Sequence, residues 1–345
     1  MSLIRIAVIG AGHWGPNLIR NFHDLQASAV GRVIDRDATR LAHVAARYPE
    51  VLVSTDAEDA FSDESIDGVV VATPTITHYP LVKRALEAGK HVLVEKPIAT
   101  RGEEADELCE LADRSGLVLM VGHVFLYNGA VRAVKQYLDA GELGRVYYIS
   151  MVRTNLGPIR ADVNAAWDLA SHDVSIVNYW LDADPLTVSS IGGSWINASV
   201  EDAVFATIRY PDEVLVNLHT SWLNPRKARD ITIVGERRML TFDDIDLNEP
   251  IRIYDKYVSD EATPADFVDT FETFRASVRD GDIRIPSVTL GEPLANECRE
   301  FIDCIGQGTR PISDGRVGAR VVRALEALTR STRASGREEK VERTD

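Results

Sequence analysis

Cysteine is scarce in this chain, and no long apolar run interrupts its mixed sequence. The three cysteines, Cys109, Cys298 and Cys304, are odd in number and lack the spacing of metal ligands, so we expect no metal site. We expect them to be reduced thiols without a role in a site, as in cytoplasmic proteins. No run approaches the roughly 18 apolar residues of a membrane-spanning helix. The N-terminus enters a strand pattern at once, without a secretion signal. We therefore expect a cytoplasmic protein with no membrane partner.

Basic residues are also in deficit, because 38 Lys and Arg face 53 Asp and Glu and leave a formal charge of −15. Binding to nucleic acid needs a basic face, so no nucleic-acid partner is expected. A small anionic substrate remains compatible, because a local arginine cluster or a helix N-terminus can hold it. The length of 345 residues, with 45% hydrophobic and 26% charged residues, favours two globular domains.

Residues 1–121 alternate short apolar strands with helices, which predicts a doubly wound parallel sheet in an α/β domain. Capping boxes are expected at Thr55 with Glu58 and at Thr100 with Glu103, and Gly89 and Gly116 stand where helices should stop. The expected strands are 3–9, 29–34, 68–72, 91–94 and 117–121, with a helix at 16–25.

Residues 122–345 follow a different pattern, in which longer strands are joined by short turns. This pattern predicts a second, α+β domain with a largely antiparallel open sheet, and the turn at 210–213 is typical of a hairpin. One face of such a sheet can stay uncovered, so we expect a homodimer or homotetramer built on that face. The expected strands are 145–154, 186–195, 203–210, 214–222 and 230–234, and the expected helices are 130–140, 290–305 and 314–331.

A glycine fingerprint occupies the turn after the first strand, in the order Gly10-Ala11-Gly12-His13-Trp14-Gly15. Between a strand and a helix, these glycines allow a tight turn and a close approach of the backbone to a pyrophosphate, which predicts a Rossmann domain with a bound dinucleotide. Asp35 ends the second strand, where a carboxylate accepts from a ribose 2′-hydroxyl and repels a 2′-phosphate. NAD is therefore favoured over NADP, although Arg36 beside it leaves some use of NADP open.

Two further segments follow strands of the same sheet, at the edge where open α/β sheets bind ligands. One runs from Thr73 and Pro74 to His78, and the other is Glu95-Lys96-Pro97. A glutamate beside a lysine is usually a solvated surface pair. At the end of a strand that faces a nicotinamide, the pair is better interpreted as part of the site.

Asp168 and His172 are four residues apart at the start of an expected helix in the second domain, so both side chains should lie on one face. A lone histidine on a helix is more often structural. A carboxylate one turn away, however, can orient the imidazole and raise its basicity, as a general base requires.

Taken together, these four segments resemble the glucose–fructose oxidoreductase / inositol dehydrogenase family, called Gfo/Idh/MocA, over nearly the whole chain. The resemblance implies that Lys96 stabilises the substrate oxygen and that His172, with Asp168, exchanges a proton with a sugar hydroxyl. Hydride would then pass between a sugar carbon and nicotinamide C4. The two domains are expected to close over NAD, with Lys96 and His172 meeting near that carbon.

The chain departs from the family pattern after the expected strand 117–121. Many members carry a G-[FY]-N-x-R-like run, whereas here Val124 and Leu126 replace the polar residues. Their contacts are expected to come from His123 or Asn128. The usual acidic residue three after the catalytic histidine is Ser175.

The run 153–164, just before Asp168, is rich in hydrogen-bonding groups, and it looks like members that oxidise C3 of UDP-N-acetylated sugars or sugar acids. Arg suits bidentate phosphate contacts, but a solvated polar loop is the alternative interpretation. Trp222 either stacks on a substrate or belongs to the core. The candidate substrate ligands in this run are Arg153, Asn155, Arg160 and Asn164.

The favoured function is a nucleotide-sugar 3-dehydrogenase that uses NAD. A ketoreductase of deoxysugar biosynthesis, an inositol or free-sugar dehydrogenase, an NAD-dependent glycosidase and a redox-idle sensor remain alternatives, and the last is disfavoured by Lys96 and His172. Unperturbed Lys and His have pKa values of about 10.4 and about 6.5, so His172 is the better base at neutral pH. Lys96 then serves as a fixed positive charge.

Overall fold

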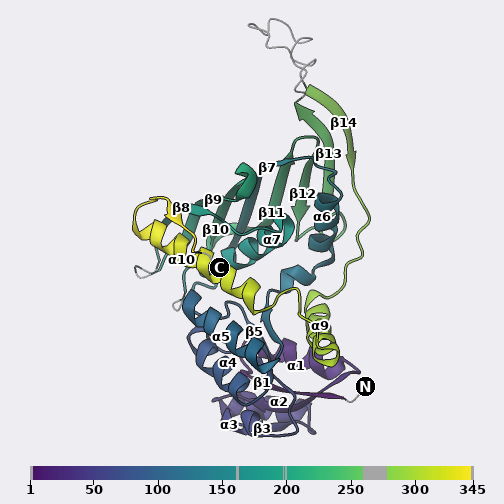
Figure 1. The fold of residues 1–345 in the computed structure, drawn as a ribbon, viewed down its shortest axis with the longest axis vertical. Helices are drawn as coiled ribbons and strands as arrows, with labels where there is room; N and C mark the ends of the chain where they lie inside the picture. Colours follow the sequence, from purple (N-terminus) through teal and green to yellow (C-terminus); the bar gives the residue numbers. More distant parts are fainter. Residues whose placement is uncertain (1–2, 161–162, 197, 199, 259–277, 343–345) are drawn as a thin grey trace, which may run out of the picture. The chain divides into compact units, whose positions relative to one another are not determined.

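The computed structural model describes residues 3–160, 163–196, 198, 200–258 and 278–342. The chain forms two compact units (Figure 1). The first comprises Met1–Tyr127 and Gly291–Glu326, and the second comprises Asn128–Leu290 and Ala327–Thr344. The first unit therefore includes residues 291–326, which the sequence pattern places in a second domain at 122–345.

The first unit is built on a six-stranded sheet in the order β3-β2-β1-β4-β5-β6, and every pairing between neighbours is parallel. The predicted doubly wound parallel sheet is confirmed. The order reverses between β1 and β4, and ligands of such sheets bind at this switch point, beyond the carboxyl ends of the strands. The strands are β1 Ile4–Ile9, β2 Ser28–Ile34, β3 Leu52–Ser54, β4 Gly68–Val71, β5 His91–Glu95 and β6 Leu119–Gly122.

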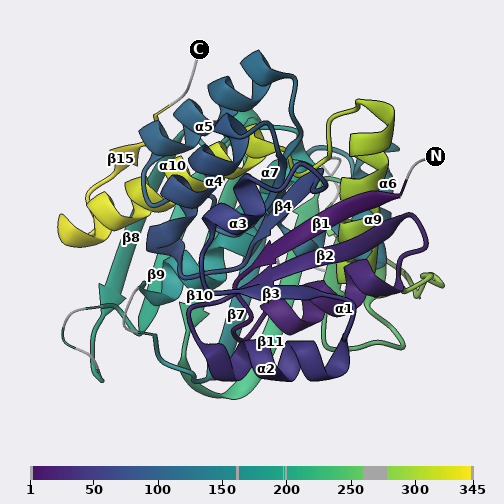
Figure 2. The same cartoon turned by 90° about the horizontal axis from the view of Figure 1, so that it is seen from below.

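Helices cover both faces of this sheet, with α1 and α2 on one side and α4 and α5 on the other (Figure 2). Gly89 and Gly116 follow α4 and α5 with positive φ, which is why these helices stop there. The helices are α1 Gly15–Asp24, α2 Ala38–Arg47, α3 Glu58–Phe61, α4 His78–Glu87 and α5 Gly102–Ser115.

The two predicted capping boxes are wrong. The first amide of α3, that of Glu58, donates to the carboxylate of Asp56 at 3.0 Å, so Thr55 is not the cap. At α5 the amide of Gly102 donates to Glu326 at 3.2 Å, and the hydroxyl of Thr100 donates to the carboxylate of Glu104. A carboxylate from a distant helix replaces the local cap in the second case, and no local sequence pattern contains that information.

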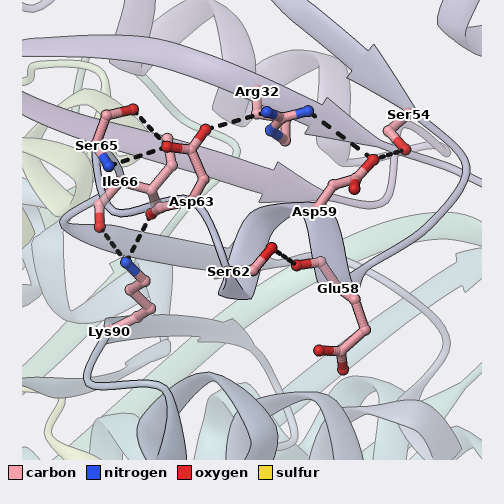
Figure 3. A network of polar contacts seen from close by, with 9 residues as sticks. All are labelled: Arg32, Ser54, Glu58, Asp59, Ser62, Asp63, Ser65, Ile66 and Lys90. Carbon is pink, nitrogen blue, oxygen red and sulfur yellow. Dashed lines mark hydrogen bonds and ion pairs between the residues drawn. The ribbon is translucent and has the colours of Figure 1, made fainter.

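A polar network fixes the loop that leads into β4 (Figure 3). Asp63 accepts from the amide and hydroxyl of Ser65 and from Arg32 of β2, and these bonds lower the pKa of its carboxyl to about 2. The ammonium group of Lys90 donates to the carbonyl oxygens of Asp63 and Ile66, each at 2.8 Å. Lys90 and Ile66 precede β5 and β4, so the network lies near the amino ends of these strands and has a structural role.

Two C-terminal helices, α9 Pro293–Gln307 and α10 Gly315–Arg333, return to the first unit, α10 with its N-terminal part. The apolar face of α9 buries Leu294, Cys298 and Phe301. Phe301 packs edge-on against Phe22 of α1, with ring centroids 6.2 Å apart. This packing explains why residues 291–326 belong to the first unit.

The second unit contains a nine-stranded sheet in the order β14-β13-β12-β11-β7-β10-β9-β8-β15. Among the described strands of this sheet, only β7 and β10 pair in parallel, so the predicted, largely antiparallel sheet is confirmed. The strands are β7 Val146–Leu156, β8 Thr187–Gly193, β9 Ala203–Arg209, β10 Leu215–Ser221, β11 Leu223–Gly235, β12 Met239–Asp243, β13 Ile251–Val258, β14 Val278–Arg284 and β15 Glu339–Lys340.

One face of this sheet packs against α6 Gly129–Asp139 and α7 Ser171–Leu181 (Figure 1). The indole of Trp180 on α7 donates to the carbonyl of Val131 on α6 and packs against Phe242 of β12. The opposite face carries solvent-exposed apolar side chains, including Phe205, which is 52% exposed. No helix in the described part of the chain is both long and apolar enough to span a bilayer.

Candidate functional site: a glycine turn, strand-end segments and a histidine helix

The glycine turn has the backbone geometry that a dinucleotide fingerprint requires. Gly10 has φ +105°, and a Cβ atom there would lie 2.4 Å from the carbonyl oxygen of Ala72. A Cβ on Gly15 would lie 2.0 Å from the carbonyl oxygen of Gly10. At Gly12 it would meet only Arg40, at 3.5 Å, so this stretch of backbone is open to a ligand. His13 and Trp14 are exposed at the start of α1. The turn therefore fits a pyrophosphate at the helix N-terminus.

Asp35 follows β2 and its carboxylate is fixed against the glycine turn. It accepts from the amide of Ala11 at 2.7 Å and from the amide of Asp37 at 2.8 Å. Arg40 of α2 forms an ion pair with it at 3.5 Å, while Arg36 is exposed. Arg40 is a cation that the sequence pattern does not reveal, because only the first turn of α2 brings it back to Asp35.

His78 joins the segments that follow β4 and β5. Its side chain is buried, with Nδ1 2.7 Å from the carbonyl oxygen of Pro97 and Nε2 2.8 Å from that of Thr73. The hydroxyl of Thr77 donates to that of Thr73 at 2.7 Å. His78 thus holds together the two expected cofactor-binding segments, the one that contains Pro74 and the one that ends at Pro97.

Glu95, Lys96 and His123 meet at the ends of β5 and β6. Burial raises the pKa of the Glu95 carboxyl to about 7, against the opposing effects of the Lys96 charge and a hydrogen bond from Trp14. His123 is 0% exposed, and burial and the charge of Lys96 lower its pKa to about 3, so it is neutral. Partly buried Glu95 and Lys96 are therefore not a solvated surface pair.

In the second unit, Asp168 lies in a π-helical turn, Ala166–Ala170, which leads directly into α7. Its carboxylate accepts from Arg160 and from the indole of Trp222, each at 3.2 Å. His172 follows in the first turn of α7 and is partly buried. The sequence predicts a single α-helix here, and the wider π turn is the difference. Trp222, 1% exposed, belongs to the core and orients Asp168, a role that the sequence does not reveal.

The candidate substrate ligands of the run 153–164 all have partners inside the second unit. Arg153 of β7 is 3% exposed and donates to Asp173 of α7 at 2.7 Å. Buried Asn164 donates to Glu201 at 2.7 Å, and Asn155 donates to the carbonyl of Gly157. Ala161 and Asp162 lie outside the described residues.

Asn128 and Ser175, which were noted where the chain departs from the family pattern, also form hydrogen bonds within the second unit. Asn128 caps α6 by accepting from the amide of Ala130 at 2.8 Å and donates to Asp244 at 3.0 Å. Ser175 donates to the carbonyl of His172 at 2.7 Å. Within the described residues, no group of three or more His, Cys, Asp and Glu side chains is arranged to hold a metal ion.

Comparison with known proteins identifies the family. Residues 4–123 match the GFO_IDH_MocA description "Oxidoreductase family, NAD-binding Rossmann fold", and residues 131–241 match "GFO/IDH/MocA C-terminal domain". An uncharacterised oxidoreductase of Escherichia coli is 31% identical over 253 residues, 68% of this chain and 69% of that relative. The chain belongs to the Gfo/Idh/MocA oxidoreductase family. Its first unit is the NAD-binding Rossmann domain, and the predicted family, enzyme class and cofactor are confirmed.

Two further comparisons extend over the whole chain. The UDP-N-acetylglucosamine 3-dehydrogenase of Acidithiobacillus ferrooxidans is 29% identical over 333 residues, 94% of this chain and 96% of the relative. A solved structure of that enzyme gives a TM-score of 0.81 at 26% identity, covering 97% of this chain and 99% of that chain. The WlbA dehydrogenase of Bordetella pertussis, solved with NADH and UDP-GlcNAcA, shares the fold with a TM-score of 0.82 at 22% identity over 99% of each chain.

Proposed function

We propose that this family member is an NAD-dependent dehydrogenase that oxidises C3 of a nucleotide-linked sugar, an N-acetylated hexose or its uronic acid. The observation that carries the proposal is the similarity to a UDP-N-acetylglucosamine 3-dehydrogenase along almost the entire length of both chains. The presence of Lys96, Asp168 and His172 in the same chain supports the chemistry. Membership in an oxidoreductase family argues against a redox-idle sensor.

In this proposal the sugar C3–H bond and the hydroxyl O–H bond both break. When bound, NAD supplies a hydride acceptor at nicotinamide C4. The imidazole of His172 takes the hydroxyl proton, and Asp168 orients the imidazole from the preceding turn. Asp168 is itself held by Arg160 and Trp222. The ammonium group of Lys96 stabilises the negative charge that develops on oxygen.

The residues at the cofactor support NAD over NADP. The carboxylate of Asp35 lies against the glycine turn, where it can accept from a ribose 2′-hydroxyl and repels a 2′-phosphate. Arg40 and the exposed Arg36 reduce this repulsion, so the preference should be finite. The exposed His13 and Trp14 are proposed contacts beside Gly12, and Thr73, Pro74 and Glu95 remain proposed contacts at the strand ends.

Not all four substrate candidates are equally accessible. Arg160 and Asn155 are partly exposed, so we keep them as proposed ligands of the sugar or its phosphates. Arg153 and Asn164 are buried and paired with Asp173 and Glu201, so their proposed role is to support the strand and the π turn that carry the ligands.

The oligomer is proposed to be a homodimer, or a dimer of such dimers, joined through the sheet face that carries Phe205. The apolar side chains of Ile191, Phe205 and Leu215 on three adjacent strands are 63%, 52% and 37% exposed. An exposed apolar patch of this kind is typical of an interaction surface.

The test is a screen for NADH formation from NAD with UDP-N-acetylglucosamine, its uronic acid, UDP-glucose, free N-acetylglucosamine and scyllo-inositol. Steady NADH accumulation with a UDP-sugar, slowed by deuterium at C3, supports the proposal. NADH formation with inositol or free sugar alone would assign the enzyme to a polyol or free-sugar dehydrogenase. Release of an aryl leaving group from an aryl glycoside, without net NADH, would indicate the glycosidase. His172→Asn is the negative control for each arm.

A further inference from the structure

Arg40 of α2 is a cation at the glycine turn whose task the proposed function leaves open. A Cβ atom on Gly12 would have one atom within 4 Å, and that is Nη1 of Arg40 at 3.5 Å. The guanidinium therefore borders the stretch of backbone that the pyrophosphate of a dinucleotide approaches. The side chain of Arg40 is 51% exposed, so it can change its conformation without disturbing the core. Arg40 is thus placed to contact a bound dinucleotide.

Two carboxylates hold Arg40, and both contacts are long. Nη1 lies 3.5 Å from Oδ2 of Asp35, and Nε lies 3.4 Å from Oδ2 of Asp37. The same oxygen of Asp35 accepts from the amide of Ala11 at 2.7 Å, and Asp37 accepts from the amide of Thr39 at 2.8 Å. Each acid therefore has a backbone hydrogen bond that is shorter than its contact with Arg40. A long ion pair with an exposed guanidinium contributes little, so Arg40 can leave either acid readily.

NADP differs from NAD by a phosphate on the ribose 2′-oxygen, the position that Asp35 is proposed to face. Such a phosphate carries about −1.5 to −2 charges at neutral pH. It repels the carboxylate of Asp35 and attracts a guanidinium, which can bind phosphate through two parallel hydrogen bonds. Asp35 and the 2′-phosphate would therefore compete for the guanidinium of Arg40.

Arg36 is the other cation beside Asp35, but it is placed differently. It is the middle residue of the turn in which the amide of Asp37 donates to Asp35 at 2.8 Å, and its side chain is exposed. The atom that borders Gly12 belongs to Arg40 and not to Arg36. Of the two arginines, Arg40 is therefore the one held between Asp35 and the glycine turn.

We propose that Arg40 decides how well this enzyme binds NADP, because its guanidinium exchanges the carboxylate of Asp35 for the 2′-phosphate. With NAD, Arg40 stays paired with Asp35, and this carboxylate remains the acceptor for the 2′-hydroxyl. With NADP, Arg40 binds the phosphate and offsets part of the repulsion from Asp35. Arg40 is a specificity-determining residue for the cofactor and takes no part in the transfer of hydride or proton. The inference rests on the proposed role of Asp35 and not on the sugar substrate.

The first test is calorimetric titration of the purified protein with NAD and with NADP, in the absence of any sugar. Arg40→Met should weaken NADP binding about 10- to 100-fold, the value of a lost hydrogen bond to a charged group, and change NAD binding by less than about threefold. Arg47→Met, the matched control in the last turn of the same helix, should change neither. Equal weakening of both cofactors by Arg40→Met overturns the proposal, as does a larger loss of NADP binding in Arg36→Met.

The second test removes the competing carboxylate. Asp35→Ser should strengthen NADP binding about tenfold or more, because one negative charge leaves the 2′-phosphate site. Adding Arg40→Met to this variant should abolish the gain, whereas adding Arg47→Met should keep it. This arm also decides the case in which the wild type binds NADP too weakly to titrate. A gain that persists without Arg40, or no gain in Asp35→Ser, shows the proposal to be wrong.

The third test loosens the second hold on Arg40. Asp37→Asn keeps a side-chain oxygen that can cap α2 but removes the charge 3.4 Å from Nε of Arg40. NADP binding should strengthen about two- to fivefold, the range of an exposed ion pair, and NAD binding should not. Raising the salt concentration from about 0.05 M to about 0.5 M should weaken NADP binding more in the wild type than in Arg40→Met, because salt screens the attraction. Equal salt dependence in these two proteins would refute the contact with the phosphate.

Discussion

The buried ion pair between Arg153 and Asp173 joins β7, where the candidate substrate run begins, to α7, the helix that carries His172. The variant Arg153→Met should show how much this ion pair contributes to the stability of the second unit. Arg153 and Asp173 are 3% and 1% exposed, and their contact is 2.7 Å long. Removing one partner of a buried pair costs about 3–5 kcal/mol. Each kcal/mol lowers the melting temperature of a unit of this size by about 2–4 °C. Arg229 lies opposite Arg153 on β11 and offsets part of the loss, so the lower half of that range is expected.

The loss should depend on pH in a defined direction. Burial raises the pKa of Asp173 above its unfolded value of about 3.9, even with Arg153 present, and removing the guanidinium raises it further. A carboxyl with a raised folded pKa contributes stability below the unfolded pKa and loses it as the pH rises through the folded pKa. Arg153→Met should therefore be less destabilising at pH 5 than at pH 8. Asp173→Asn leaves two arginines facing each other but removes the group that titrates, so its cost should not rise between pH 5 and pH 8.

Thermal unfolding followed by tryptophan fluorescence suits this measurement, because Trp14 is the one tryptophan of the first unit and the other four lie in the second. Arg209→Met is the matched control, since its ion pair with Glu338 is exposed and spans 3.9 Å, so a loss below about 1 kcal/mol is expected. Equal losses for Arg153→Met and Arg209→Met, or a greater loss for Arg153→Met at pH 5 than at pH 8, would refute the reasoning.

Further outcomes are expected for five variants. Asp35→Ser should shift the ratio of kcat/KM values toward NADP, and a wild type that prefers NADP would contradict the role of Asp35. His172→Asn should lower turnover roughly 10²–10⁴-fold and remove the acidic limb of the pH–rate profile, with NAD binding by calorimetry unchanged. Lys96→Ala should also lower turnover but keep that limb, and the opposite result for the two variants would make Lys96 the base. Trp222→Phe, which removes the donor to Asp168 at 3.2 Å, should lower kcat about 10- to 100-fold, the value of one lost hydrogen bond to a charged group, while the fluorescence-detected melting shifts by only a few degrees. Phe205→Glu should reduce the mass by light scattering to that of a monomer, whereas an unchanged oligomer would place the interface elsewhere.

The sequence predicts the parallel sheet and the glycine turn of the first unit well because their signals are local. A buried parallel strand is a short apolar run, as in 68–71, and the glycine turn is fixed by steric limits that act within a few residues. The sequence misses β3, whose three residues are partly or fully exposed, because such an edge strand lacks an apolar run. It also misses β12 to β14, although buried and partly exposed residues alternate in β12 and at the start of β13.

The candidate site likewise combines residues that the sequence reveals with residues that it does not. The sequence reveals the proposed reacting groups Lys96, Asp168 and His172, because their residue types and spacing suit the proposed chemistry. The sequence does not reveal the residues that hold such groups and helices in place, because each comes from a distant element. Trp222 at the end of β10 donates to Asp168, and Glu326 of α10 takes the place of a local cap of α5.

The polar run 153–164 shows how far composition can mislead about a role. Arginine and asparagine in the run before the helix of His172 suit phosphate and hydroxyl ligands as well as they suit buried internal partners, and only burial separates the two uses. Arg153 lies on β7 between β10 and β11, so its side chain emerges from the middle of the sheet, where Asp173 of α7 meets it. Arg160 lies after the strand and stays partly exposed beside Asp168. The position of an arginine relative to the end of its strand therefore decides whether its guanidinium is buried against an internal partner or stays partly exposed beside Asp168.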